Sequence, residues 1–119
     1  MKDFRRLKVW HKGHAIVLMV YEATQDFPKE ELYGLTSQIR RAAGSIPANI
    51  AEGCGRSGNA EFGRFLQIAM GSATELEYHL LLSKDLGYID EKKHRSLDSM
   101  TLELQRMLST LIRKVKAET

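Results

Sequence analysis

The chain has 119 residues, of which 43% are hydrophobic and 28% charged, and its formal net charge is +3. One cysteine excludes an internal disulfide, and the longest apolar run, residues 15–21, is too short to span a bilayer. The first ten residues lack the apolar segment of a secretory signal, so the sequence predicts a cytoplasmic protein with one globular domain over residues 1–119 and no membrane partner.

The first predicted helix runs from about Leu7 to Asp26, and apolar residues recur along it at helical spacing. Phe27 precedes Pro28, and because a residue before proline avoids the helical region, the helix is expected to end there. Its predicted core residues are Val9, Trp10, Ile16, Val17, Val20, Tyr21 and Thr24.

The second predicted helix begins near residues 29–31 and continues to about Gly53, with Gly34 placed where it can interrupt the first turn. Pro47 lies inside this helix and cannot donate to the carbonyl oxygen of Ala43, which predicts a bend around the neighbouring helices. One face carries the predicted core residues Leu35, Ile39, Ala42, Ala43, Ile46 and Ile50.

The last two predicted helices run from about Asn59 to Leu86 and from Asp90 onward. Gly87 is expected to end the first of them, and Asp90 to cap the second. Because the connections between all four helices are short, the sequence predicts an all-α, antiparallel up-down-up-down four-helix bundle. The predicted core residues are Phe62, Phe65, Leu66, Ala69, Ala73, Leu76 and Leu80 in the third helix, and Leu97, Met100, Leu104, Met107, Leu108, Leu111 and Val115 in the fourth.

Beside the apolar face of the second helix lies a stripe of polar side chains, which helix packing alone does not explain. In one interpretation it is a structural network, whose charged members pair with Glu75 or Glu77 of the third helix while Asn49 bonds across the bundle. In the other it meets a second subunit or phosphates, and the small residues Ser37, Gly44 and Ala48 on this side favour a subunit interface. The predicted network residues are Arg41, Ser45, Asn49, Glu52, Arg56 and Glu75.

Basic residues gather near both ends of the chain, although the net charge of +3 is modest. One interpretation is that these side chains collect phosphates of a nucleic acid. The alternative is a solubilising face, with the last cations complementing the dipole of the fourth helix. The candidate nucleic-acid contacts are Arg5, Arg6, Lys8, Lys12, Arg113, Lys114 and Lys116.

Motifs that resemble catalytic or cofactor sites do not fit their structural requirements. The glycines of residues 53–58 have G-x-G-x-x-G spacing, but a helix precedes them where a dinucleotide site needs a strand, so a turn between helices is the better interpretation. Glu91 and His94 are half of a di-iron motif without its second half, and His11, His14 and His79 have no ligand cluster beside them. Cys54 near a helix C-terminus is expected to be an unreactive thiol. The sequence therefore predicts no catalytic residue, no metal and no cofactor.

Motifs at fixed spacing cover nearly the whole chain. They are Leu7-x-Val9-Trp10, Val20-Tyr21-x-x-Thr24-x-x-Phe27-Pro28, Glu31-Leu32-Tyr33-Gly34-Leu35-x-x-Gln38-x-Arg40-Arg41-Ala42-Ala43, Ser45-Ile46-x-x-Asn49-Ile50-Ala51-Glu52-Gly53-x-Gly55-Arg56, Glu61-Phe62-x-x-Phe65-Leu66-x-x-Ala69-x-Gly71-Ser72, Glu75-Leu76-Glu77 and Leu86-Gly87-Tyr88. In these motifs the chain resembles the 23S rRNA intervening-sequence proteins. One departure is Gly58, where the family commonly has Ser or Thr to cap the third helix and close a capping box with Glu61.

The resemblance implies a four-helix bundle that assembles as a ring-like homo-oligomer, with a pentamer expected, and it implies no enzyme activity. A related branch resembles the accessory protein of diversity-generating retroelements, which binds a reverse transcriptase and nucleic acid. The leading hypothesis is a non-catalytic homo-oligomer that binds RNA or an RNA-associated protein. The alternative is a protein-interaction scaffold with no nucleic-acid role.

Overall fold

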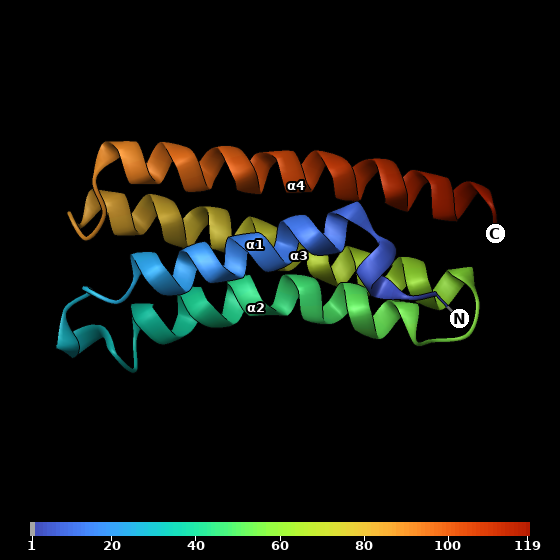
Figure 1. Cartoon of the computed structure of the whole chain (residues 1–119), viewed down its shortest axis with the longest axis horizontal. Helices are drawn as coiled ribbons and strands as arrows, with labels where there is room; N and C mark the ends of the chain where they lie inside the picture. Colours follow the sequence, from blue (N-terminus) through green and yellow to red (C-terminus); the bar gives the residue numbers. More distant parts are fainter. Residues whose placement is uncertain (1) are drawn as a thin grey trace.

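A computed structural model describes residues 2–119 as a bundle of four long helices that alternate in direction (Figure 1). The long helices are α1 (Lys8–Ala23), α2 (Leu35–Cys54), α3 (Asn59–Asp85) and α4 (Glu91–Ala117), with short 3-10 helices η1 (Phe4–Arg6) and η2 (Lys29–Glu31). No strand occurs within the described range, and the bundle measures 45 × 23 × 20 Å. The all-α four-helix bundle predicted from the sequence is confirmed. Both chain termini lie at the same end of the bundle (Figure 1).

The first helix is shorter than predicted, because α1 ends at Ala23 rather than near Asp26. The Thr24 hydroxyl donates to the carbonyl oxygen of Val20 at 2.8 Å, and the chain turns before it reaches Pro28. The predicted core position of Tyr21 is wrong: its side chain is 47% exposed, and the Arg40 guanidinium lies over its ring at 4.5 Å. Tyr21 therefore lies on the surface between α1 and α2.

The second helix is interrupted at Gly34, so that residues 29–31 form the separate η2 and α2 starts at Leu35. The Glu31 carboxylate replaces a capping side chain, since it accepts a hydrogen bond from the Leu35 N–H at 3.1 Å. It also accepts one from the Tyr88 hydroxyl at 3.0 Å, which raises the pKa of that phenol. Glu31 thus ties the start of α2 to the turn that precedes α4.

Pro47 lies inside α2 and is buried against α1. Gly13 of α1 faces it, because a Cβ at Gly13 would lie 3.2 Å from Ile46 Cγ2 and 3.6 Å from Pro47 Cδ. The absence of a side chain at Gly13 lets α1 approach α2 at this point. The two helices therefore pack closely around the proline.

The third helix has the predicted bounds to within one residue, and all seven of its predicted core residues are buried. It ends in a Schellman motif, in which Tyr88 N–H donates to the Ser83 carbonyl and Gly87 adopts a φ of +79°. At its start, Gly58 has a φ of +82°, a conformation that a serine or threonine would adopt only under strain. Glu61 bonds Arg64 instead of closing a capping box.

The fourth helix begins as predicted, with the Asp90 side chain accepting from Lys93 N–H at 2.7 Å. Of its predicted core residues, Leu97, Leu104, Leu108 and Val115 are buried, and the other three are half-buried. Sequence reasoning missed Thr101, which is fully buried because its hydroxyl donates to the Leu97 carbonyl at 2.8 Å. A satisfied hydroxyl allows this threonine to occupy a core position.

Candidate functional site

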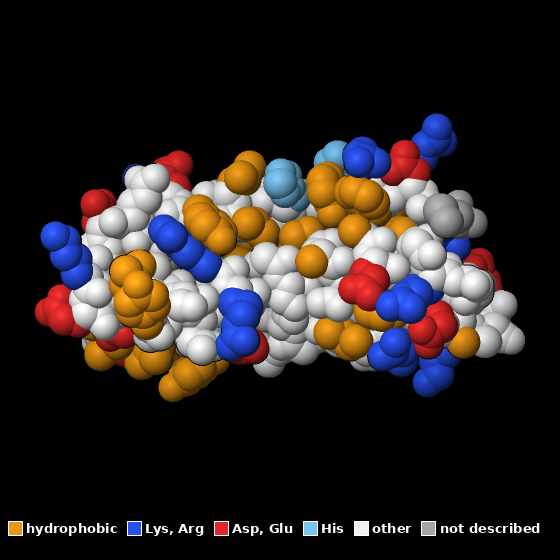
Figure 2. All heavy atoms as spheres, turned by 90° about the horizontal axis from the view of Figure 1, so that it is seen from below, with side chains coloured by type: hydrophobic (Ala, Val, Ile, Leu, Met, Phe, Trp, Pro, Cys, Tyr) orange, Lys and Arg blue, Asp and Glu red, His pale blue; other side chains and the backbone are white. Residues whose placement is uncertain are grey.

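The polar stripe of α2 lies on the outer side of the bundle, which Figure 2 shows from the α2 side. Arg41, Glu52 and Arg56 are exposed, while Ser45 and Asn49 are half-buried beside α3. Part of the stripe therefore lies on the exposed surface, and part lies at the contact between α2 and α3.

The predicted ion pairs from α2 to Glu75 and Glu77 do not form. Arg56 instead pairs with Glu52 of its own helix at 2.7 Å, and Arg41 donates to Gln38 at 2.7 Å. Glu75 is engaged by His79, one turn along α3, and Glu77 accepts from Gln105 of α4. The polar side chains of α2 and Glu75 therefore bond one turn away in their own helices, and Glu77 bonds α4 instead of α2.

Ser45, rather than Asn49, forms the hydrogen bond between α2 and α3. The prediction that Asn49 bonds across the bundle is therefore wrong. Asn49 Nδ2 donates to the Ser45 carbonyl and hydroxyl at 2.7 and 2.8 Å, within α2. The Ser45 hydroxyl in turn accepts from the Ser72 hydroxyl of α3 at 2.9 Å. Sequence reasoning missed Ser72, although its position next to the core residue Ala73 indicates that it lies near a contact between helices. This network holds two helices of one chain together.

The middle of the α2 face is built from small residues and has open space above it. A Cβ at Gly44 would meet no atom within 4 Å, and the same holds for Gly71 of α3. In Figure 2 a pale, mostly uncharged region lies near the middle of this face, with charged side chains on both sides of it. A glycine inside a helix costs about 0.5–1 kcal/mol relative to alanine, and no contact within residues 2–119 accounts for Gly44.

A hollow of about 590 Å³ opens beside this region at the start of α2. Tyr21, Tyr33 and Arg41 line it, and the Tyr33 side chain is 92% exposed. Exposed aromatic side chains next to a small-residue helix face are suited to contact with another protein surface.

The fold brings the two basic segments of the sequence to the same end of the bundle, where both termini lie (Figure 1). Segments 2–12, 52–67 and 103–119 form this end and contain eleven lysines and arginines against five aspartates and glutamates. The rest of the chain contains seven against ten. The net charge of +3 is therefore the sum of a basic end and an acidic end.

The seven candidate nucleic-acid residues differ in whether an acidic side chain of the same chain already pairs with them. Arg5 lies 3.5 Å from the Asp3 carboxylate, and Lys12 Nζ is bonded to Glu103 at 2.7 Å. The bond from Lys12 lowers the pKa of Glu103, so this link between α1 and α4 holds at neutral pH and weakens when acid protonates the carboxylate. Among the seven candidates, the exposed side chains that form no ion pair within residues 2–119 are Arg6, Lys8, Arg113, Lys114 and Lys116.

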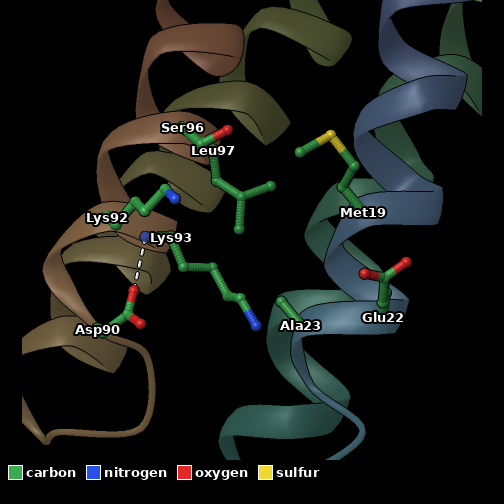
Figure 3. A pocket seen from close by; sticks show the side chains of 8 residues that line it. All are labelled: Met19, Glu22, Ala23, Asp90, Lys92, Lys93, Ser96 and Leu97. Carbon is green, nitrogen blue, oxygen red and sulfur yellow. Dashed lines mark hydrogen bonds between the residues drawn. The ribbon is translucent and has the colours of Figure 1, made fainter.

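A pocket of about 330 Å³ lies between α1 and α4 near the acidic end (Figure 3). Met19 and Leu97 point toward each other across it, and Lys93 extends over its opening toward Ala23. The Asp90 carboxylate at its rim is occupied in capping α4. The pocket thus combines the apolar side chains of Met19 and Leu97 with charged side chains, Glu22, Lys92 and Lys93, in its lining.

Within residues 2–119, no three histidine, cysteine, aspartate or glutamate side chains lie close enough together to hold a metal ion. Two of the glycines of residues 53–58 have structural reasons: a Cβ at Gly53 would lie 2.8 Å from Phe65 Cβ, and Gly58 has a positive φ. None of the helices in the described part of the chain combines the length and apolar character needed to cross a membrane.

Cys54 is expected to react slowly with thiol reagents in the folded protein. Its side chain is buried, and burial raises the pKa of the thiol, which leaves little thiolate at neutral pH. We expect labelling by Ellman's reagent at pH 7.5 to be much slower than in urea-unfolded protein. Labelling at the same rate in both states would show that the site opens readily.

Comparison with known proteins identifies the family of this chain. The family model described as 23S rRNA-intervening sequence protein matches residues 5–110. The chain belongs to this family. A solved structure from Bacteroides thetaiotaomicron, a protein of unknown function from the S23 ribosomal protein family, is 27% identical, with a TM-score of 0.79. The match covers 87% of this chain and 97% of the other. No curated protein matches the chain.

Proposed function

We propose that this chain is the subunit of a non-catalytic homo-oligomer that binds RNA. The observation that carries the proposal is the concentration of cations at one end of the bundle, most of them exposed and unpaired. Lysines and arginines that neutralise phosphates release counterions, which supplies most sequence-independent affinity for nucleic acid. The acidic opposite end would be repelled, so the RNA is oriented toward the termini.

Assembly strengthens this proposal, because copies of the chain in a ring bring their basic ends together. A pentamer would carry about five times the charge of one chain on a single surface. The small-residue face of α2, with Gly44 under open space and Tyr33 beside it, is the surface we assign to subunit contact.

RNA binding is tested with a fluorescently labelled, structured RNA in a salt titration. We expect binding at low salt, and a linear fall of log affinity with log salt between about 50 and 200 mM. Absence of binding at the lowest salt would exclude RNA as the partner, because phosphate contacts are strongest there.

Assembly is tested by light scattering on Gly44→Gln, which adds a long side chain at a position where a Cβ meets no atom within 4 Å. The expected result is a smaller particle than the wild type, at an unchanged helical content. Ser99→Gln, at an exposed position of α4, is the matched control and should keep the wild-type mass. A wild-type mass for Gly44→Gln would remove this face from the interface.

A second candidate function is a protein-interaction scaffold without a nucleic-acid role. The hollow lined by Tyr21, Tyr33 and Arg41 favours it, since exposed aromatic and arginine side chains are typical of protein interfaces. Affinity capture with and without nuclease separates the two functions. A protein partner retained after nuclease treatment supports the scaffold, and one lost with the RNA supports the first proposal.

A further inference from the structure

A groove of about 530 Å³ runs between α3 and α4, toward the basic end of the bundle. Arg106 and Arg113 of α4 line it, and Ser109 lies between them on the same side of the helix. The arginines are seven residues apart, which is two helical turns or about 10.5 Å along the axis. They therefore form a short row of positive charge on one wall.

These arginines are available for a ligand. Both are exposed, and neither guanidinium forms an ion pair within the described residues. The carboxylate of Glu103, which lies close enough to Arg106 to be influenced by its charge, is held by Lys12 of α1. Both guanidinium groups thus keep their N–H donors free for phosphate oxygens.

The rest of the lining decides what kind of nucleic acid fits. Its apolar part is aliphatic, from Met70 and Leu102, and no aromatic side chain lines the groove. Sequence-tolerant binding of single strands depends on aromatic side chains on which the bases stack. A duplex keeps its bases inside and presents rows of phosphates, so it requires no such platform.

We propose that the α3–α4 groove is the site where this protein binds the phosphate backbone of duplex RNA, with Arg106 and Arg113 as its anchors. The inference rests on the RNA binding proposed above and adds where the RNA lies and which form of it is bound. Binding through phosphates alone depends little on base sequence.

The experiment measures fluorescence anisotropy with two short RNA duplexes of unrelated sequence and an oligouridylate strand of the same length. The test variant is Arg106→Gln/Arg113→Gln, and the matched control is Lys92→Gln/Arg95→Gln, which removes the same charge from exposed positions at the other end of α4. For the test variant we expect a loss of about tenfold or more in duplex affinity and a salt slope smaller by about two. The control should bind as the wild type does, and both duplexes should bind equally well and more tightly than the single strand.

Three results would overturn the inference in different ways. Wild-type binding that the test variant retains in full would move the site elsewhere and leave the proposed function intact. Tighter binding of oligouridylate than of duplex would exclude the duplex backbone as the ligand. No binding of any RNA at low salt would remove the proposed function together with the groove. Because both arginines are exposed, thermal melting and particle mass should not change in the test variant, which excludes misfolding as the cause of lost affinity.

Discussion

Replacing Gly53 by alanine is expected to lower the free energy of unfolding by about 1–3 kcal/mol. The added Cβ would lie 2.8 Å from Phe65 Cβ and 3.1 Å from Phe62 Cδ1. A Cβ atom is fixed to the backbone and cannot rotate away, so the end of α2 has to move from the start of α3. The gain in helix propensity from glycine to alanine, about 1 kcal/mol at most, only partly offsets this crowding.

The matched control is Gly44→Ala, in the same helix and with the same chemical change. No atom lies within 4 Å of the new Cβ, so this variant should gain about 0.5–1 kcal/mol of stability within one chain. Urea unfolding at several protein concentrations measures both variants, because assembly makes stability depend on concentration. Equal stabilities for Gly53→Ala and Gly44→Ala would contradict the close contact at Gly53.

The parts of the fold that depend on local sequence could be predicted. The seven core residues of α3 follow a helical period, and Asp90 and Gly87 have side-chain and backbone properties that fix a helix end. The sequence also predicts the break at Gly34, but not the role of Glu31, whose carboxylate caps the start of α2. That role depends on the path of η2, which the helical period does not determine.

The contacts of long polar side chains could not be predicted in the same way. Tyr21 fits the apolar period of α1, yet its side chain is exposed, and Arg40 of the next helix packs over its ring. Arg56 could reach several carboxylates, and a partner one turn away in its own helix costs the least side-chain ordering. Which partner such a side chain contacts depends on the rotation of each helix about its axis. A spacing of three or four residues in the sequence does not determine this rotation.

The candidate site also has one part that could be predicted from the sequence and one part that could not. An antiparallel four-helix topology already implies that the start of α1 and the end of α4 meet at one end, so the basic end could be predicted from the sequence. The groove at Arg106 could not, because it depends on how α3 and α4 are rotated toward each other. Arg106 belonged to a basic stretch of the sequence without any sign that it faced a groove.

Replacing Ile46 by alanine is expected to cost about 2–5 kcal/mol of unfolding free energy. Ile46 is fully buried, and its Cγ2 lies 3.2 Å from the position that a Cβ of residue 13 would take. The substitution leaves a cavity at the point where α1 approaches α2 beside Pro47. We expect neighbouring side chains to fill it only in part, because surrounding structure relaxes incompletely around such cavities.

Adding Gly13→Ala to Ile46→Ala should restore part of this loss. In the wild type the new methyl group would crowd Ile46, which offsets the helix propensity that alanine brings to α1. In the Ile46→Ala background the crowding is gone and the methyl group enters the cavity, so we expect a coupling energy of about 1 kcal/mol between the two positions. Gly71→Ala, on the open side of α3, should add to Ile46→Ala without coupling. If Gly13→Ala also proved additive with Ile46→Ala, the two residues could not share the contact that brings α1 onto α2.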